Sequence, residues 1–302
     1  LHEDNTSITV DDLGLATEPD PEVLRQTLLK WARGVDVKDV DGDGDITDVR
    51  FQMGDPIHSQ PVIVNYSATD SAIFVATNHG VLHSIDAYTG EENFAVMPRE
   101  LLPNVLDFYK DNSSFNHIYG LDGDMVLRES AGRTYLYLGM RRGGRNYYVF
   151  DVTAKTSPVL KFKIEGGSAG LEKLGQSWSR PTITKVNIGG SVKNVMIVGG
   201  GYDPEQDGRT VRAEDSIGNA VFMFDADTGA LLWHASNADA DLNLSNMNYS
   251  IPGRISVIDR DNDGLADHMY VADLGGQLFR LDIYNGKSGN EFIKGARLAD
   301  FG

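Results

Sequence analysis

The sequence contains no cysteine, few basic residues and no long hydrophobic run. Without cysteine, the chain has no disulfides, no cysteine-ligated zinc and no thiol catalysis. No hydrophobic run approaches the roughly 20 residues that span a bilayer, so we expect no membrane insertion. The 27 Lys and Arg against 44 Asp and Glu give a net charge of −17. Because a protein that follows phosphates needs a basic face, this charge argues against nucleic-acid and anionic-membrane binding.

The residues before position 51 are predicted to form an N-terminal extension. The chain starts at Leu1, shows no signal peptide and ends partway through a repeat, so we expect it to be part of a longer protein. The first 17 residues are polar, and we expect them to be loosely held. A helix is predicted over 21–33, with Asp20 as N-cap, Pro21 at its first position and Gly34 as its stop. Its predicted buried face comprises Val23, Leu24, Thr27, Leu28 and Trp31.

Residues 51–302 are predicted to be all-β and repetitive. Similar runs of apolar strand, tight turn and alternating strand occur at 73–96, 135–162, 195–235 and 268–286. Each contains an aspartate that closes a strand and opens a turn, and three of these turns end in glycine. We expect the aspartates to accept backbone N–H groups and the glycines to adopt positive φ. The aspartates are Asp86, Asp151, Asp225 and Asp282, and the glycines are Gly90, Gly229 and Gly286.

A Ser-x-Pro pattern indicates a further strand at the start of three units. It occurs at 59–61, 179–181 and 250–252, each time ahead of an apolar run. Proline is tolerated at the first residue of a strand, so we expect four strands per unit. Four-stranded units of this period are typical of a modified, quinoprotein-like β-propeller, here incomplete and part of a larger ring. We also expect a partial fifth unit at 101–128. A β-sandwich is the alternative fold.

The stretch "DRDNDGLAD" (259–267) is a candidate calcium loop. Calcium binds six to eight oxygens, often from alternate positions of one loop. Here Asp259, Asp261, Asp263 and Asp267 occupy positions 1, 3, 5 and 9, and Leu265 offers its carbonyl at position 7. It differs from an EF-hand because Tyr270 replaces the glutamate at position 12 and strands are predicted on both sides. Magnesium is disfavoured because it rarely uses an all-protein cage. The alternative is an acidic surface turn.

A second, weaker candidate lies at 39–48. Asp39, Asp41 and Asp43 take positions 1, 3 and 5, Asp45 offers a carbonyl, and Thr47 stands at position 9. Asp48 comes one position late. This segment lies outside the repeats, and a solvated linker is the alternative. The stretch 202–208 contains only two aspartates and is interpreted as a surface turn.

Catalysis is poorly supported, and we expect no enzyme. His58, His79, His83 and His117 are scattered over predicted strands and turns, as packing or turn residues. The basic cluster 140–146 is interpreted as a hairpin tip that relieves the acidic field, with anion binding as an alternative. The two tryptophans Trp178 and Trp233 are assigned to the core.

The order of these motifs resembles a known family. "WARGVDVKDVDGDGDITD", "GDPIHSQP", "VGGGYDP" and "DRDNDGLADHMYVADLGGQLFRLDI" are similar to the C-terminal domain of type IV pilus tip-associated biogenesis and adhesin proteins of the PilY/PilC type. The resemblance implies a propeller at the pilus tip or cell surface, calcium in the 259–267 loop, and an effect of calcium on pilus extension against retraction. It implies minor pilins, the pilus machinery and a host or abiotic surface as partners, in adhesion and twitching motility. The stretch 33–36, Arg-Gly-Val-Asp, departs from the family's Arg-Gly-Asp motif, so integrin binding is not carried over.

Two other functions stay open. "FDADTGALLW" (224–233) resembles a docking motif of quinoprotein dehydrogenases that use pyrroloquinoline quinone. Against that function, the matching position in the first unit is Phe94 and the expected adjacent cysteines are absent. The other alternative is a calcium-stabilised cell-surface domain unrelated to pili, such as an integrin-like propeller, which would carry the aspartate loop in several units.

Overall fold

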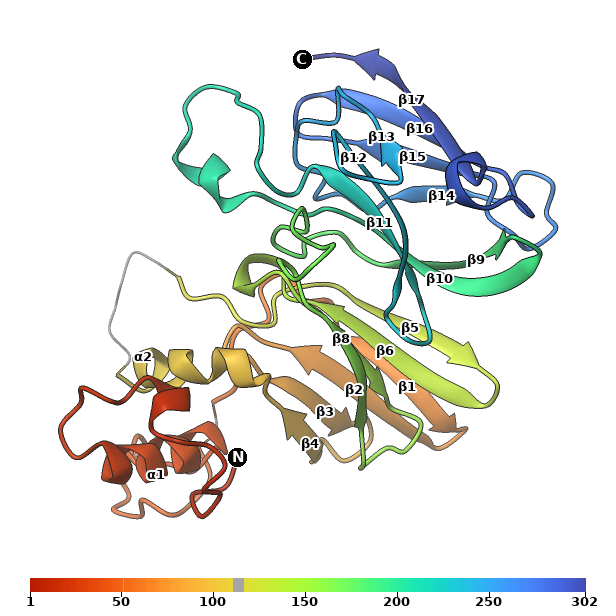
Figure 1. Cartoon of the computed structure of the whole chain (residues 1–302). Helices are drawn as coiled ribbons and strands as arrows, with labels where there is room; N and C mark the ends of the chain where they lie inside the picture. Colours follow the sequence, from red (N-terminus) through yellow and green to blue (C-terminus); the bar gives the residue numbers. More distant parts are fainter. Residues whose placement is uncertain (51, 111–116) are drawn as a thin grey trace.

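The computed structural model describes residues 1–50, 52–110 and 117–302, and the strands of these residues form four sheets in chain order (Figure 1). We call these sheets blades 1 to 4. Blade 1 contains β1 (Val62–Ser67), β2 (Asp70–Ala76), β3 (Leu82–Asp86) and β4 (Glu92–Val96); blade 2 contains β5 (Met125–Ser130), β6 (Arg133–Gly139), β7 (Tyr147–Asp151) and β8 (Val159–Ile164). Blade 3 contains β9 (Thr182–Ile188), β10 (Ser191–Gly199), β11 (Ala220–Asp225), β12 (Leu231–Ser236) and β13 (Leu242–Asn243); blade 4 contains β14 (Ser256–Ile258), β15 (His268–Ala272), β16 (Gln277–Ile283) and β17 (Ile293–Asp300).

The predicted four-stranded units are confirmed, with one addition and one error. In each blade the first four strands are neighbours in sequence order and pair antiparallel. Blade 3 adds β13, which runs parallel to β12. The expected fifth unit at 101–128 is wrong. Its first part forms a 3-10 helix and α2, and its last residues belong to β5, the first strand of blade 2.

Successive blades pack face to face. Because side chains alternate across a strand, β16 buries every second residue, from Gln277 to Ile283. One apolar cluster joins blades 1 and 2 around Phe74 and Leu136. A second joins blades 2 and 3 around Tyr137 and Phe222, and a third joins blades 3 and 4. Each blade therefore depends on its neighbour to cover one apolar face.

The repeated aspartates fasten the turns that follow β3, β7 and β11. Asp86 accepts the backbone N–H groups of Tyr88 and Thr89, both at 2.8 Å, and Asp225 does the same for residues 227 and 228. Asp151 accepts from Thr153. The three glycines have φ between 77° and 88°, as predicted. The prediction is wrong for Asp282, whose carboxylate instead accepts from the side chains of residues 268 and 280 on its own sheet.

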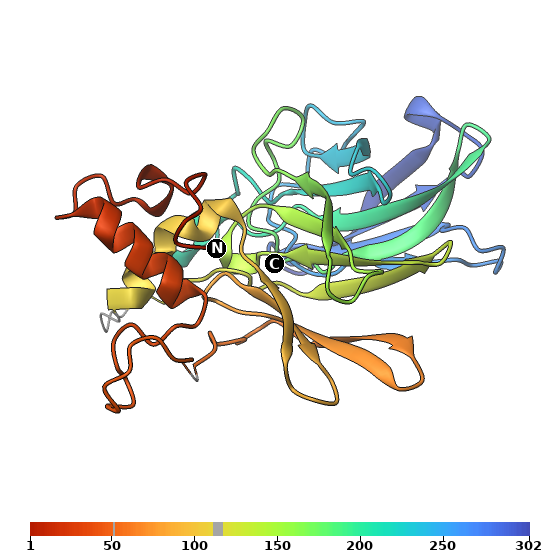
Figure 2. The same cartoon turned by 90° about the horizontal axis from the view of Figure 1, so that it is seen from below.

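A helical region lies at one end of blade 1, as Figure 2 shows. It contains α1 (Pro21–Ala32) and α2 (Val105–Lys110), with 3-10 turns at Asp11–Leu13 and Arg99–Asn104; further 3-10 turns occur at Arg141–Gly143, Pro204–Gly208 and Gly289–Glu291. The predicted helix and its stop at Gly34 (φ 89°) are confirmed. Its predicted face is partly wrong because Val23 is 67% exposed, whereas Arg25 is buried. Asp20 precedes the helix in a left-handed conformation, and its side chain makes no capping hydrogen bond.

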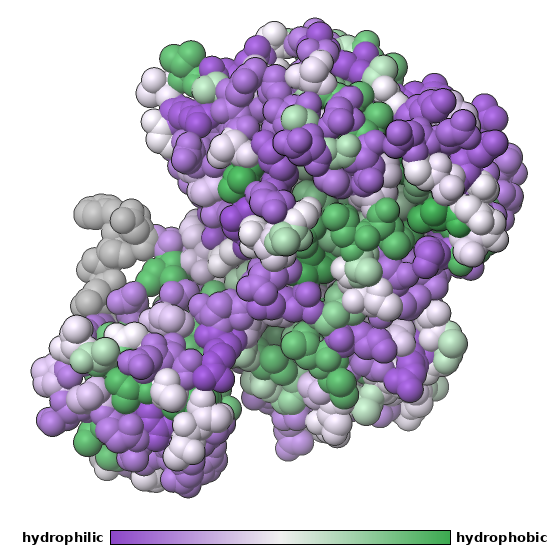
Figure 3. Space-filling model, in the orientation of Figure 1, coloured by the Kyte–Doolittle hydropathy of each residue, from purple (hydrophilic) through white to green (hydrophobic). Residues whose placement is uncertain are grey.

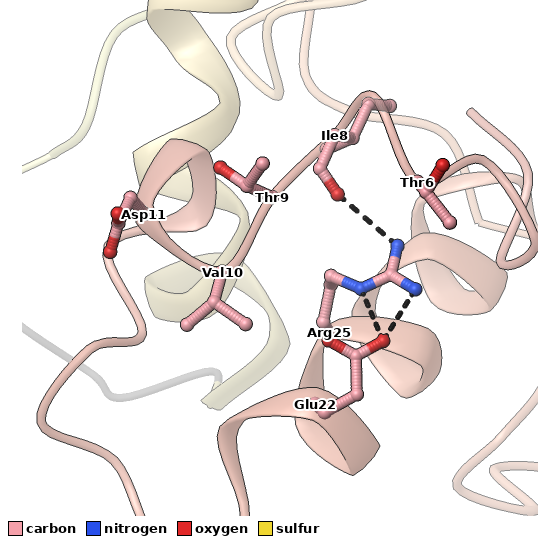
Figure 4. A pocket seen from close by; sticks show the side chains of 7 residues that line it. All are labelled: Thr6, Ile8, Thr9, Val10, Asp11, Glu22 and Arg25. Atoms are coloured by element: carbon pink, nitrogen blue, oxygen red, sulfur yellow. Dashed lines mark hydrogen bonds and ion pairs between the residues drawn. The ribbon is translucent and has the colours of Figure 1, made fainter.

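Buried Arg25 holds the N-terminal segment, which is therefore not loosely held as expected. Its guanidinium donates to the carbonyl oxygens of Glu3 (3.1 Å), Asn5 (3.2 Å) and Ile8 (3.2 Å), and its Nε donates to Glu22 (Figure 4). Apolar side chains of the segment pack with α1 and with the 99–110 connection between blades 1 and 2: Ile8, Leu13 and Leu15. Because these contacts are distant in sequence, the polar composition concealed them.

The surface is mainly hydrophilic, in keeping with the net charge. Figure 3 shows green hydrophobic side chains gathered across the middle of one face, between the first two blades and the last two. Among the described residues, no helix has the length and hydropathy needed to cross a membrane.

Replacing Arg25 with alanine is expected to release residues 3–15. A buried cation with several carbonyl partners contributes more than an exposed pair, so the free energy of unfolding should fall by about 2–4 kcal/mol. Arg33→Ala is the matched control, because Arg33 is an exposed arginine that bonds Glu3 at 2.9 Å, and it should cost less than about 1 kcal/mol. Denaturant unfolding and hydrogen exchange of residues 3–15 check both values. Equal losses in the two variants would contradict this role.

Candidate metal centre

The first aspartate loop is the hairpin connection between β14 and β15, as predicted. Its backbone curls around carboxylates: Asp259 accepts from the N–H groups of Asp263 (3.2 Å) and Gly264 (2.8 Å). Asp267 accepts from the N–H of Arg260 at 2.7 Å. Gly264 has φ 87°, a conformation that glycine adopts without strain. These hydrogen bonds join residues close in sequence, so the loop is shaped by its own backbone and carboxylates.

Three of the four predicted carboxylates converge. One oxygen each of Asp259, Asp261 and Asp267 lies within 4.8 Å of the other two. Asp263 is outside this group, and its carboxylate accepts from the N–H of Leu265 at 2.8 Å. The convergence brings together positions 1, 3 and 9 of the predicted loop.

Asp267 connects this loop to the blade. Its N–H donates to the carbonyl of Ile258 in β14, and its own carbonyl accepts from Ile283 at the end of β16, at 2.7 Å. The neighbouring Ala266 is fully buried and donates to Lys185 of blade 3. Asp259 and Asp261, in contrast, are exposed. The site therefore has one carboxylate fixed to the sheets and two on the outer part of the hairpin.

The electrostatics of this cluster favour a cation. Among the described residues, none of its carboxylates forms a salt bridge, although Arg260 lies in the same loop. Like charges this close repel one another, and a divalent ion would remove that repulsion. Clustered carboxylate oxygens are hard ligands suited to calcium.

The second loop shows a similar but less complete cluster. Oxygens of Asp39, Asp41 and Asp43 lie within 4.8 Å of one another. Thr47, predicted at position 9, instead donates its hydroxyl to Asp45 at 2.6 Å, and this bond lowers the pKa of Asp45. Burial, followed by repulsion from Asp41 and other aspartates, raises the pKa of Asp48. The structure thus gathers the first three predicted ligands of this loop but directs Thr47 elsewhere.

Each of the four histidines considered above contacts a neighbouring side chain. His58 Nδ1 bonds the buried Asp122 at 2.7 Å, and His83 Nδ1 bonds Glu92 at 2.6 Å. His79 lies between the rings of Trp31 and Phe108, where burial lowers its pKa. The remaining one, His117, pairs with Asp55 at 3.2 Å.

Two other assignments need correction. Trp233 is buried in the core, but Trp178 is only half-buried and stacks on Tyr202, with ring centroids 4.6 Å apart.

The stretch 202–208 is more than a surface turn. It contains the 3-10 helix Pro204–Gly208, capped by the buried Asp203, which accepts from the N–H groups of Glu205 and Ser216. The Asp-Pro pair at its start is a helix N-terminus signal that composition alone did not reveal.

Replacing Gly264 with alanine tests the left-handed turn of the first loop. A Cβ at this position meets no atom within 4 Å, so the cost arises from the backbone alone and should be about 1 kcal/mol. Gly253→Ala is the matched control, because its Cβ also meets open space but its φ is not positive. Thermal unfolding without divalent cations should show a loss only for Gly264→Ala. An equal melting temperature for both variants would contradict the turn geometry.

Comparisons with known proteins agree with the motif order and the fold. The PilY1 beta-propeller domain family matches residues 52–296. The type IV pilus biogenesis factor PilY1 homolog of Xylella fastidiosa is 30% identical over 220 residues, which cover 70% of this chain and 14% of that protein. The type IV pilus biogenesis factor PilY1 of Pseudomonas aeruginosa is 26% identical over 267 residues, covering 78% of this chain and 21% of that protein.

A solved structure shows the same architecture. The crystal structure of the Pseudomonas aeruginosa PilY1 C-terminal domain has a TM-score of 0.50 and 25% sequence identity, covering 71% of this chain and 39% of that one. The chain spans about a fifth or less of the length of these two curated relatives. The predicted resemblance is confirmed: the chain belongs to the PilY1 beta-propeller domain family of type IV pilus biogenesis factors.

Proposed function

We propose that this chain is the calcium-binding propeller module of a type IV pilus protein, without enzymatic activity. The observation that carries the proposal is the convergence of Asp259, Asp261 and Asp267 on one hairpin, in a chain of this family. Three carboxylates supply half of the six oxygens that calcium needs at minimum. The carbonyl of Leu265 and the carboxylate of Asp263 are the nearest further donors in sequence, and water completes such shells.

Calcium in this loop would act on the geometry of blade 4. Without the ion, repulsion drives Asp259 and Asp261 away from Asp267. With it, the outer part of the hairpin is pulled toward the residue that is hydrogen-bonded to β14 and β16. Ion binding and local ordering are thus coupled, and the affinity decides whether the ion is a permanent staple or a switch. The loop 39–48 is proposed as a second, weaker calcium site.

The biological role follows from the relatives. Both are named type IV pilus biogenesis factors. We infer that the module acts at the pilus tip or cell surface, where calcium occupancy biases pilus extension against retraction. Its proposed partners are minor pilins, the pilus machinery and the surface to which the cell adheres during twitching motility. Family membership argues against a propeller unrelated to pili and gives no support to quinone-dependent dehydrogenation.

Replacing Asp259 with asparagine should weaken calcium binding to the first loop by about 10- to 100-fold. Asparagine keeps the shape but has a single acceptor oxygen. It therefore retains one of the two hydrogen bonds that the Asp259 oxygens accept from Asp263 and Gly264, and one charge is lost. Isothermal titration calorimetry measures the affinity. Asp239→Asn is the control for charge alone, since Asp239 is exposed and lies outside both loops. Asp39→Asn should leave the high-affinity event intact. Equal affinity in the Asp259 and Asp239 variants would rule out the proposed site.

The role in pili is tested in cells that express the complete protein. Asp259→Asn should change the number of surface pili and the twitching zone, and the wild type should show the same change when calcium is removed. Asp239→Asn should behave as wild type in both assays. If the Asp259 variant loses calcium binding in vitro but retains normal pili and motility, calcium is a structural ion and the regulatory role is wrong.

A further inference from the structure

Arg141, in the connection between β6 and β7, has an unusual backbone. Its φ is 52°, in the left-handed region that arginine rarely adopts. It begins the 3-10 turn Arg141–Gly143, which is yellow-green near the centre of Figure 1. A strained conformation at a non-glycine residue persists only where the surrounding structure imposes it, and such residues concentrate at functional sites. The strained backbone therefore indicates that the Arg141 side chain has a function.

The Arg141 guanidinium lies over the ring of Trp178 but donates no hydrogen bond to any described residue. Its centre lies 4.3 Å from the ring centroid of Trp178, and its Nε is buried without a hydrogen-bond partner among the described residues. Within residues 1–50, 52–110 and 117–302, the one carboxylate within salt-bridge range of it belongs to Asp122, with an oxygen 3.8 Å from Nε, beyond hydrogen-bond range. That oxygen already pairs with His58 Nδ1 at 2.7 Å. Asp122 balances charge but leaves the donors of Arg141 free.

The two neighbouring arginines, in contrast to Arg141, have hydrogen-bond acceptors for their guanidinium groups. Arg142 forms two hydrogen bonds with Asp207, at 2.6 and 3.0 Å. Arg145 donates to two backbone carbonyls, those of Leu174 and Glu172. Of the three, only Arg141 has no hydrogen-bond acceptor in the part of the chain that the structure describes, and its side chain is 28% exposed.

The backbone under Arg141 is rigidly held. Ser177 accepts the N–H of Met140 with its hydroxyl at 2.8 Å and the N–H of Arg141 with its carbonyl at 3.2 Å. The loop also packs against the segment before β5 so closely that a Cβ on Gly143 would lie 1.8 Å from the carbonyl oxygen of Gly120. The guanidinium is thus positioned before any ligand arrives, which reduces the entropy lost on binding.

We propose that Arg141 and Trp178 form a binding site for a carboxylate group. A guanidinium fork matches the two oxygens of a carboxylate, and the Trp178 ring fixes the plane of the fork. The ligand is a monoanion because the net charge of −17, together with Asp122 and Asp207, repels a phosphate dianion more strongly. Tyr119 and Tyr202, which lie with Trp178 around Arg142, provide an aromatic surface for an apolar group beside the carboxylate.

This site is independent of the proposed calcium function, because it shares no residue with either aspartate loop and its ligand has the opposite charge. The failure of one proposal therefore leaves the other unaffected.

The experiment follows the three indole N–H signals of ¹⁵N-labelled protein during titration with acetate and with benzoate. Chloride keeps the ionic strength constant, and Trp178→Phe identifies the relevant signal. The expected result is a saturable shift of the Trp178 signal, with benzoate binding more tightly than acetate. Arg141→Gly should weaken the affinity on the order of tenfold or more, and Arg141→Lys, which keeps the charge but not the fork, should weaken it less.

Controls separate binding from folding. Glycine suits φ 52°, so Arg141→Gly should melt no lower than wild type. Arg212→Lys is the matched control, since Arg212 also lies over an aromatic ring, that of Tyr249, but already donates to the carbonyl of Gly275. It should leave the Trp178 titration unchanged. The proposal is overturned if neither acetate nor benzoate gives a saturable shift, or if Arg141→Gly binds them as wild type does. It is also overturned if Arg141→Gly and Arg141→Lys bind the carboxylates equally and differ only in stability, because Arg141 would then have a structural role.

Two short peptides then distinguish a C-terminal carboxylate from a glutamate side chain as the source of the ligand. One carries a free C-terminal carboxylate, and the other is amidated and carries one internal glutamate. The peptide that reproduces the benzoate shift identifies the source, and a shift with neither would restrict the site to small carboxylates.

Discussion

The packing of one blade on the next is the constraint on which the rest of this structure depends. A single four-stranded sheet has an apolar face that water would reach, and each of the three clusters between blades removes one such pair of faces from water. The side chains at these faces are almost all apolar, so the interior contributes stability but little chemistry. Among the described residues, those other than glycine that have a positive φ lie outside the strands, in the connections and the N-terminal region, where water or a ligand can reach them.

The order of connections in a meander then decides which loops can act together. Successive hairpins of an antiparallel sheet lie at opposite ends of its strands. The β14–β15 loop with the aspartates joins a first strand to a second, whereas the β6–β7 connection with Arg141 joins a second to a third. The two sites therefore lie at opposite ends of the blades. At the aspartate end, Ala266 donates to Lys185 and Gly189 donates to Lys287, so the ends of blades 3 and 4 are joined by backbone hydrogen bonds.

The sequence predicted those features that depend on neighbours within about ten residues. The Asp86 and Asp225 turns, the glycine stop of the first helix and the curl around Asp259 all arise from local hydrogen bonds and φ preferences. The Ser-x-Pro pattern predicted the strands that begin after Pro61 and Pro181, because proline removes a donor that the first residue of a strand does not need. Local patterns also gave the four-strand count, and the motif order gave the family.

What the sequence did not predict depends on contacts between distant residues. Arg25 is not part of the predicted buried face of the first helix, but it is buried because its partners lie about twenty residues earlier in the chain. Trp178 was assigned to the core with Trp233. It is instead half-buried, with Tyr202 stacked on its ring and the guanidinium groups of Arg141 and Arg142 over it. Residue type alone therefore gives no indication of either position.

The two ends of the blades also differ in what limits their chemistry. At the aspartate end, the groups are held by short local hydrogen bonds, and repulsion between them opposes their approach. Under the proposed calcium binding, a cation would complete the arrangement, and order there would depend on its concentration. At the Arg141 end, the positions of the side chains are set by the backbone packing of Gly143 on Gly120 and by Ser177. Order there exists before binding, so the proposed carboxylate would bind without first having to fold its site.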